Sequence, residues 1–482
     1  MRIYKLLFFV LVIFLIIFSV LIFIQEFYDK DLLGAILILS SCLFIIPFVI
    51  KDDKNIKSYM FRPFIVFLMG YFVVFFQRYY DLYLGFISKN DDVFYGENLI
   101  IYSLLLSCIG FTTFLIGYYS TSHKPLYSKK NYSIYYKTDY LKKIMLFTTL
   151  LVVIFVSKDI LSGNFNYDQE DLEKNAGGMS NYSSILFVVV YFALLSLSVY
   201  NCKLLKQNRL KDFINHFGTN SLLCLGIYVI SLSLGGSRSN VIIISVSLLF
   251  AMLYVCNKRF GLFAVIIGVA SFAYVMSFIG ITRKFQGMSM AQKAKVVETI
   301  NLEKKSIMPT TLELAGSLQT FNASLDYVPK YHDYLYGSFH VRNVVSAIPF
   351  SSRFSSIFFD SRKRYHSSDF FVTYIIQGEN YLYGNGTSIN ADLYLNYGSV
   401  GIFIGMLILG VVFRKTEFSV LASGKPSLNS IVLFMFLMGY ALPYSRNGFL
   451  APINYIMFVY IFLYFYKKKF ARIAVDNNNE QK

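Results

Sequence analysis

The feature that most constrains the fold of this chain is a series of long apolar runs without charged residues, which recur from one end to the other. Each run is long enough, at about 20 residues, to cross a hydrocarbon layer of roughly 30 Å as a helix. Charged residues make up only 15% of the chain, whereas soluble domains carry about 25%. The sequence therefore predicts an integral membrane protein with many spans and excludes a set of soluble domains.

The apolar runs predict an all-α polytopic membrane bundle of about twelve transmembrane helices. The first run follows Arg2 and Lys5 and lacks the small residues of a cleavage site, so it is predicted to be a retained span. The predicted spans are 5–25, 31–50, 61–77, 98–119, 141–157, 181–201, 218–237, 239–257, 261–281, 393–413, 428–445 and 448–466.

The charges between the runs predict which side each loop faces. An even number of spans puts both termini on one side, and loops rich in Lys and Arg face the cytoplasm. The net charge of +17 is concentrated in loops on the side of the termini, so we predict cytoplasmic termini. This charge is interpreted as an orientation signal and not as a nucleic-acid-binding surface. The basic stretches are 51–62, 124–143, 203–211 and 467–472.

One connection, residues 282–392, is much longer than the others and is predicted to face outward. Its apolar and polar residues alternate in helix-like patches around 292–300, 311–321 and 341–350, and long loops with their own pattern are usually functional. We expect two or more short helices there that lie along the outer membrane surface and cap a cavity. The predicted organisation is 1–281 with nine spans, 282–392 as a large periplasmic loop, 393–466 with three spans, and 467–482 as a basic cytoplasmic tail.

Several kinds of function are disfavoured by what the sequence lacks. No ionisable residue lies in the central part of a predicted span, whereas ion-coupled transporters need such groups at membrane depth. The five cysteines lie in apolar runs or at their ends, without the spacing of a disulfide framework or a metal site. The motifs of phosphate-binding loops and serine hydrolases are also missing. We therefore predict neither a metal nor a cofactor.

Two turns on the predicted outer side each place an arginine at the start of a helix. Arg238 stands between Ser237 and Ser239 after two glycines, and Arg446 precedes an Asn-Gly pair. Glycines let the backbone approach a ligand closely, and a helix N-terminus beside a guanidinium suits a phosphate group. We predict that both turns bind phosphate. The alternative is an interfacial arginine that reaches lipid headgroups.

The long loop and its end supply further candidates. Arg283, directly after the ninth predicted span, and Arg342, in an apolar helix-like patch, are predicted to join the phosphate site. A hydroxyl nucleophile must also lose a proton to a base on the same face. The candidates for this base are Asp392, Glu379 and His340. An Asp at a helix start can also serve only as a cap.

Tyrosine is frequent in the long loop, while tryptophan is absent from the whole chain. Aromatic faces can stack on sugar rings, but tyrosine is also common at membrane interfaces. Both interpretations stay open for these residues, which are Tyr327, Tyr331, Tyr334, Tyr336, Tyr365, Tyr374, Tyr381 and Tyr383.

The order and sidedness of these features resemble those of the bacterial O-antigen polymerase (Wzy) family, which is related in fold to O-antigen ligases and C-type glycosyltransferases (GT-C). The matching features are a large outer loop before the last three spans, the Gly-Ser-Arg turn at 236–238, the stretch Asp392–Gly398 and the Arg446-Asn-Gly turn. The chain departs from the ligases, because Ile389 stands at the position of their His and Asn396 at that of their Glu.

The resemblance implies an inverting glycosyltransferase with a GT-C-like bundle in the bacterial inner membrane and an active site in the periplasm. Such an enzyme transfers a glycan en bloc from undecaprenyl pyrophosphate to the non-reducing end of a lipid-linked repeat unit, without a metal. The implied partners are the undecaprenyl-pyrophosphate-linked oligosaccharide, membrane lipid and a chain-length regulator protein, with no nucleic acid. An O-antigen ligase and a lipid-linked oligosaccharide flippase remain as alternatives.

Overall fold

A computed structural model of the protein describes most of the chain. The described residues are 2–24, 28–49, 61–121, 133–161, 179–234, 238–258, 261, 263, 267–268, 306–346, 348, 360, 362–381, 384–422 and 426–475.

Helices form nearly all of the regular structure. They are α1 (Arg2–Ile24), α2 (Lys30–Val49), α4 (Pro63–Phe75), α5 (Gln77–Tyr83), α6 (Glu97–Ser120), α7 (Asp139–Leu161), α9 (Met179–Leu204), α10 (Leu210–Phe217), α11 (Thr219–Leu234), α12 (Arg238–Val255), α15 (Leu312–Ala315), α16 (Leu318–Tyr327), α17 (Ser338–Ser346), α19 (Ser368–Gln377), α20 (Ile389–Leu421), α21 (Leu428–Tyr440) and α22 (Ile453–Phe470). The short 3-10 helices are η1 (Pro309–Thr311), η2 (Lys363–Tyr365) and η3 (Pro443–Arg446). Strands β1 (Ser133–Tyr136) and β2 (Ala471–Val475) pair in antiparallel fashion.

The helices coincide with the predicted apolar runs. Eleven of the twelve runs have a helix in the same place, and the remaining run, 261–281, falls almost wholly outside the described residues. Within the described part of the chain, four helices (α2, α6, α9 and α20) are long and apolar enough to cross a membrane alone. The number rises to six if the bent pairs α4–α5 and α10–α11 each count as one span. The protein is thus a helical multi-pass membrane protein, while the total of twelve spans stays a prediction.

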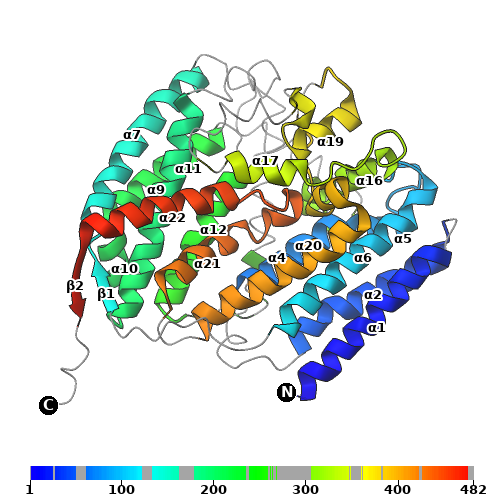
Figure 1. Ribbon diagram of the computed structural model, residues 1–482, viewed down its shortest axis with the longest axis horizontal. Helices are drawn as coiled ribbons and strands as arrows, with labels where there is room; N and C mark the ends of the chain where they lie inside the picture. The colour runs from blue at the N-terminus through cyan, green and yellow to red at the C-terminus, as the bar shows by residue number, and fades with distance from the viewer. Residues whose placement is uncertain are drawn as a thin grey trace.

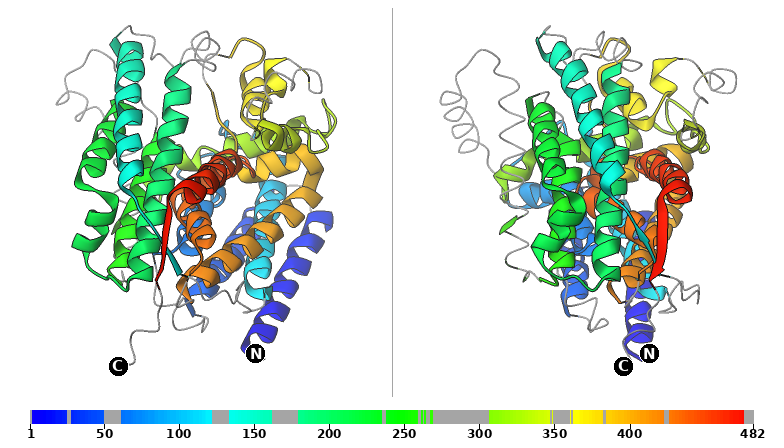
Figure 2. Two further views of the ribbon diagram at one scale, coloured as in Figure 1. Left: turned by 60° about the vertical axis from the view of Figure 1, so that its left-hand side comes forward. Right: turned by 90° about the vertical axis from the view of Figure 1, so that its left-hand side faces the viewer.

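The short helices of the predicted outer loop gather at one end of the bundle. Figures 1 and 2 show α16, α17 and α19 together there, whereas the start of α1 and strand β2 lie at the opposite end. Figure 1 also shows α7, α9 and α10 on one side of the molecule and α1, α2 and α6 on the other. Two of the predicted helix-like patches, around 311–321 and 341–350, therefore contain helices, and the patch at 292–300 lies outside the described residues.

Helices α6 and α20 pack against each other through glycines. A Cβ atom placed on Gly117 would lie 2.1 Å from the Leu407 carbonyl oxygen, and one on Gly410 would lie 2.1 Å from that of Phe114. Close backbone approach at small residues is a main source of helix association in lipid. These glycines are therefore what allows the two helices to touch along their length.

Substitution of Gly410 by alanine is expected to destabilise the bundle by about 1–3 kcal/mol, since the atom in the way belongs to a backbone that cannot rotate aside. The measurement is thermal unfolding of the purified variant in detergent. Gly226→Ala in α11 is the matched control, because a Cβ there meets nothing within 4 Å. Equal melting temperatures for the two variants would contradict the role of close approach at Gly410.

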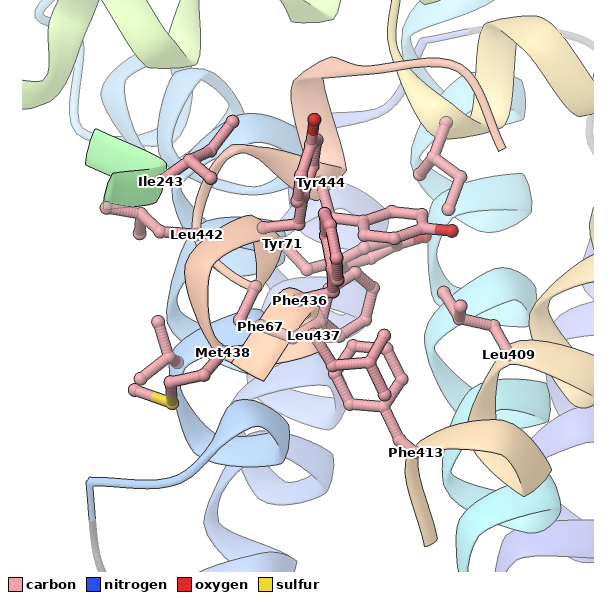
Figure 3. Close-up of a cluster of buried hydrophobic side chains, with 14 of the residues drawn as sticks. Phe67, Tyr71, Ile243, Leu409, Phe413, Phe436, Leu437, Met438, Leu442 and Tyr444 are labelled. Carbon is pink, nitrogen blue, oxygen red and sulfur yellow. The ribbon is translucent and has the colours of Figure 1, made fainter. Parts of the chain in front are cut away.

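Aromatic rings fill the space between α4, α20 and the turn after α21. Figure 3 shows Phe67, Phe413 and Tyr444 in this buried cluster. The ring centroids of Phe67 and Phe413 are 5.3 Å apart, and those of Phe67 and Tyr444 are 6.2 Å apart. Aromatic pairs at such distances contribute beyond their buried area. The cluster therefore fixes η3, which follows Leu442, relative to α20.

A buried ionic cluster lies near the C-terminal end of α20. The Glu417 carboxylate accepts hydrogen bonds from the Tyr118 hydroxyl and the Phe64 backbone N–H, both at 2.7 Å. Arg62 pairs with Glu417 at 3.5 Å, and the Arg414 guanidinium lies over the Tyr118 ring, 5.1 Å from its centroid. The predicted span ended at residue 413, before these charged residues, whereas α20 continues to Leu421. Breaking such a buried pair is costly, so the cluster locks α4, α6 and α20 together.

Helix α20 bends sharply at Gly398, where φ is 66° and ψ is −157°. In a straight helix, residues 393 and 401 would be about 12 Å apart along the axis. In this protein a Cβ on Gly401 would lie 2.5 Å from the Leu393 carbonyl oxygen, and a Cβ on Gly405 would lie 2.4 Å from a Leu393 methyl carbon. The first nine residues of α20 are therefore folded back on the rest, and the apolar pattern alone did not predict this bend.

Candidate active site

Two of the three predicted bases lie in contact. His340 of α17 and Asp392 of α20 are joined by a hydrogen bond of 2.9 Å between Nε2 and Oδ2. The Asp392 side chain is fully buried, and its Oδ2 also accepts the Phe449 backbone N–H at 2.7 Å. An ionised carboxylate can only accept, so the histidine must carry its proton on Nε2 when it is neutral. The other ring nitrogen, Nδ1, is then available to accept a proton.

The start of α20 is built so that Asp392 need not cap the helix. Ser388 is the N-cap, and its hydroxyl oxygen accepts the Ala391 N–H at 3.4 Å. Asn390 donates from Nδ2 to the Tyr71 hydroxyl of α4 at 2.9 Å, which ties the helix start to the bundle. Because a serine fills the capping position, the Asp392 carboxylate can be directed at His340.

The predicted Arg446 turn borders this pair. The prediction that Arg446 begins a helix is wrong, because Arg446 is the last residue of η3 and the next helix, α22, begins only at Ile453. After Arg446 the chain passes Gly448 to reach Phe449, whose N–H binds Asp392. A Cβ on Gly448 would lie 3.4 Å from both Asp392 Oδ2 and the Ser368 hydroxyl oxygen. The turn after α21 therefore contacts the carboxylate, and the start of α19 lies against that turn.

The start of α12 at Arg238 lies at the same end of the molecule as η3, whereas residues 235–237 of the predicted turn lie outside the described residues. Helices α12 and α21 pack in antiparallel fashion, with Phe250 and Phe434 rings 5.0 Å apart and a Cβ on Gly439 placed 2.6 Å from the Ile243 carbonyl oxygen. Helix α12 begins at Arg238, and α21 runs towards η3, which contacts α12. The structure thus brings the start of α12 and η3 to one region.

Residues 6–472 match the family described as O-antigen polysaccharide polymerase Wzy. The chain belongs to this family. The match extends from α1 to β2, so the resemblance based on the arginine turns and the Asp392–Gly398 stretch is confirmed. No curated protein and no solved structure matches the chain.

The other residues predicted for the phosphate site, where the structure describes them, show no contact with the His340–Asp392 pair. Ser237 and Arg283 lie outside the described residues, and Ser239 is exposed in the first turn of α12. Arg342 donates from Nη1 to the carbonyl oxygens of Tyr365 at 2.9 Å and Asp360 at 3.2 Å. Partial burial lowers the pKa of Arg342, and the Asp360 carboxylate opposes this shift.

The third predicted base is separate from the pair. Glu379 is exposed, and its Oε1 accepts a hydrogen bond of 2.5 Å from Arg364. The Arg364 guanidinium lies 4.7 Å from the centroid of the Tyr374 ring. Glu379 is therefore held by Arg364 and takes no part in the contact between His340 and Asp392.

One contact of the Wzy site was not predicted from the sequence. The Tyr397 hydroxyl lies 3.3 Å from His340 Nδ1, and the two ring centroids are 5.3 Å apart. Tyr397 belongs to the stretch Asp392–Gly398 that supported the family resemblance, and this was the signal that could have identified it. Among the described residues, no group of three His, Cys, Asp or Glu side chains could hold a metal ion.

Proposed function

We propose that the protein is an O-antigen polymerase that transfers a glycan en bloc from undecaprenyl pyrophosphate to the non-reducing end of a lipid-linked repeat unit. The family supports polymerisation of this kind in general. The observation that carries the finer proposal is the His340–Asp392 hydrogen bond beside the Arg446 turn. This arrangement places His340, which can take the proton of the acceptor, beside the Arg446 turn, which can hold the departing pyrophosphate.

In the proposed reaction the acceptor hydroxyl oxygen attacks the anomeric carbon of the donor sugar. The bond from this carbon to the pyrophosphate oxygen breaks, and the oxygen keeps the electron pair. The proton of the acceptor passes to His340 Nδ1, and the carboxylate of Asp392 stabilises the imidazolium that results. Direct displacement inverts the anomeric carbon, and the donor brings its own leaving group, so the proposal requires no metal.

The arginine turns supply the positive charge that the leaving pyrophosphate needs. Charge-assisted hydrogen bonds to phosphate contribute roughly 1.5–3 kcal/mol each. We assign this role first to Arg446 and Arg238, with Ser237 and Ser239 as hydroxyl donors beside the latter. Arg283 and Arg342 complete the proposed set.

The proposal places the site at the periplasmic face of the inner membrane and the termini in the cytoplasm. The position of α16, α17 and α19 opposite the start of α1 supports this sidedness, as do the basic stretches on the side of the termini (Figure 2). The proposed bundle is of the GT-C type, with nine spans, the loop 282–392, three spans and the tail 467–482. A chain-length regulator is the proposed protein partner.

Deletion of the gene tests this function. A gel of surface glycan from the deletion strain should show a single added repeat unit, and restoring the wild-type gene should produce a ladder. Complete loss of added units in the deletion strain would contradict polymerisation and favour the flippase or the ligase. The ligase is already disfavoured, because Ile389 and Asn396 replace its His and Glu.

A further inference from the structure

The turn before α17 holds an exposed tyrosine in a strained conformation. Tyr336 has φ of 46°, in the left-handed region that residues with a side chain rarely adopt, and it is 77% exposed. Its ring recovers little by packing, so the fold gains nothing from a tyrosine at this position. Strain of this kind at an exposed side chain is a sign of a functional contact.

The strained turn is held firmly against the bent part of α20. The Leu335 N–H donates to the Leu395 carbonyl oxygen at 2.9 Å. Beside this hydrogen bond, the ring centroids of Tyr334 and Tyr394 are 5.8 Å apart. The backbone at Tyr336 is therefore fixed, so binding of a ligand to this residue would cost little conformational entropy of the backbone.

The same turn reaches the side of His340 that faces away from Asp392. The next residue, Gly337, also has positive φ, and a Cβ on it would lie 2.4 Å from the Tyr397 hydroxyl oxygen. That hydroxyl is the group 3.3 Å from His340 Nδ1, and Tyr397 is 45% exposed. Tyr397 thus adjoins the nitrogen to which the proposed function assigns the proton, and Tyr336 directly precedes the glycine that contacts Tyr397.

We propose that Tyr336 and Tyr397 form the binding subsite for the terminal sugars of the acceptor saccharide. The C–H face of a pyranose ring packs on an aromatic face, and the phenol hydroxyls can bond to the sugar hydroxyls. The reacting hydroxyl takes the place of the Tyr397 hydroxyl at His340 Nδ1. This inference rests on the proposed function, because only an acceptor-deprotonating histidine makes the position of the sugar matter.

The absence of tryptophan from the chain permits a direct binding test. Tyr336→Trp in the full-length purified protein provides the sole indole fluorophore of the chain, in the turn that precedes the helix of His340. The probe is the repeat-unit oligosaccharide released by mild acid from the pyrophosphate of the lipid-linked repeat unit of the host. We expect a saturable fluorescence change with Tyr336→Trp and none with Tyr464→Trp, a control at a tyrosine of α22 that is 64% exposed. A flat titration with Tyr336→Trp would overturn the subsite.

Polymer length supplies the second readout. Tyr336→Asn removes the ring but keeps a residue that tolerates positive φ. We expect it to shorten the glycan ladder and to raise the acceptor concentration for half-maximal rate by about tenfold, with kcat little changed. A wild-type ladder from Tyr336→Asn would overturn the subsite while leaving the polymerase intact. If the wild-type gene failed to restore any ladder in the deletion strain, this would instead contradict the proposed function.

Discussion

Asp392→Asn is expected to lower the rate of polymer formation by about 10²–10⁴-fold, so that surface glycan shows one repeat unit where the wild-type gene gives a ladder. The substitution keeps the size of the side chain, but it removes the charge that stabilises protonated His340. The new amide can also donate to His340 Nε2, which favours the tautomer with the proton on Nδ1. His340→Gln removes the proton acceptor itself and should give the same glycan pattern.

The control for this experiment is Glu379→Gln, which changes a carboxylate of the same loop that is exposed and paired with Arg364. It should leave the ladder unchanged. The amount of each variant in the membrane must also be measured, because Asp392 holds the Phe449 N–H as well as His340. A ladder of normal length from Asp392→Asn would remove this residue from the mechanism.

The second large effect is expected at the arginine turns. Arg446→Ala should slow polymerisation roughly tenfold to a hundredfold, the equivalent of one charge-assisted bond to the departing pyrophosphate. Arg446→Lys should recover little of this rate, because lysine lacks the planar fork that binds two phosphate oxygens at once. The measurement is the initial rate of glycan elongation in membranes that contain equal amounts of each variant.

Arg362→Ala is the matched control for the arginine turns. Arg362 is another arginine of the outer loop, and it is exposed and paired with its neighbour Asp360 at 2.5 Å. Exposed pairs of this kind contribute little, so its loss should not change the rate. Full-length polymer from both Arg446→Ala and Arg238→Ala would contradict the pyrophosphate role of the two turns.

The sequence predicted where the helices lie because an apolar run of membrane length leaves the backbone few alternatives. It did not predict the shape of α20, since hydropathy does not register a bend inside one continuous apolar segment. The spacing of Gly398, Gly401 and Gly405 was the available signal, because each of the last two accommodates an atom of Leu393. The charges at Arg414 and Glu417 ended the predicted span early, although burial and pairing keep them inside the helix.

The candidate site was predicted in its members but not in its geometry. The sequence offered three possible bases, a carboxylate or imidazole at each of Asp392, His340 and Glu379. Only the fold shows that His340 and Asp392 are in contact and that Glu379 is paired with Arg364 instead. His340 and Asp392 lie on different elements, and the bend of α20 that directs Asp392 towards α17 leaves no trace in the hydropathy of the chain, although the glycine spacing marks its place. Tyr397 shares this bend, which explains why its contact with His340 was also missed.

The attachment of α20 at both ends has a consequence for the movement of the product. Its first turn is bound through Asp392 to α17 and to the turn after η3, its middle is seated on α6 at Gly410, and its far end is fixed through Glu417. These contacts therefore fix α20 along its axis relative to its neighbours. In the proposed reaction the lengthened glycan would have to be displaced by one repeat past a carboxylate that is fixed in this way.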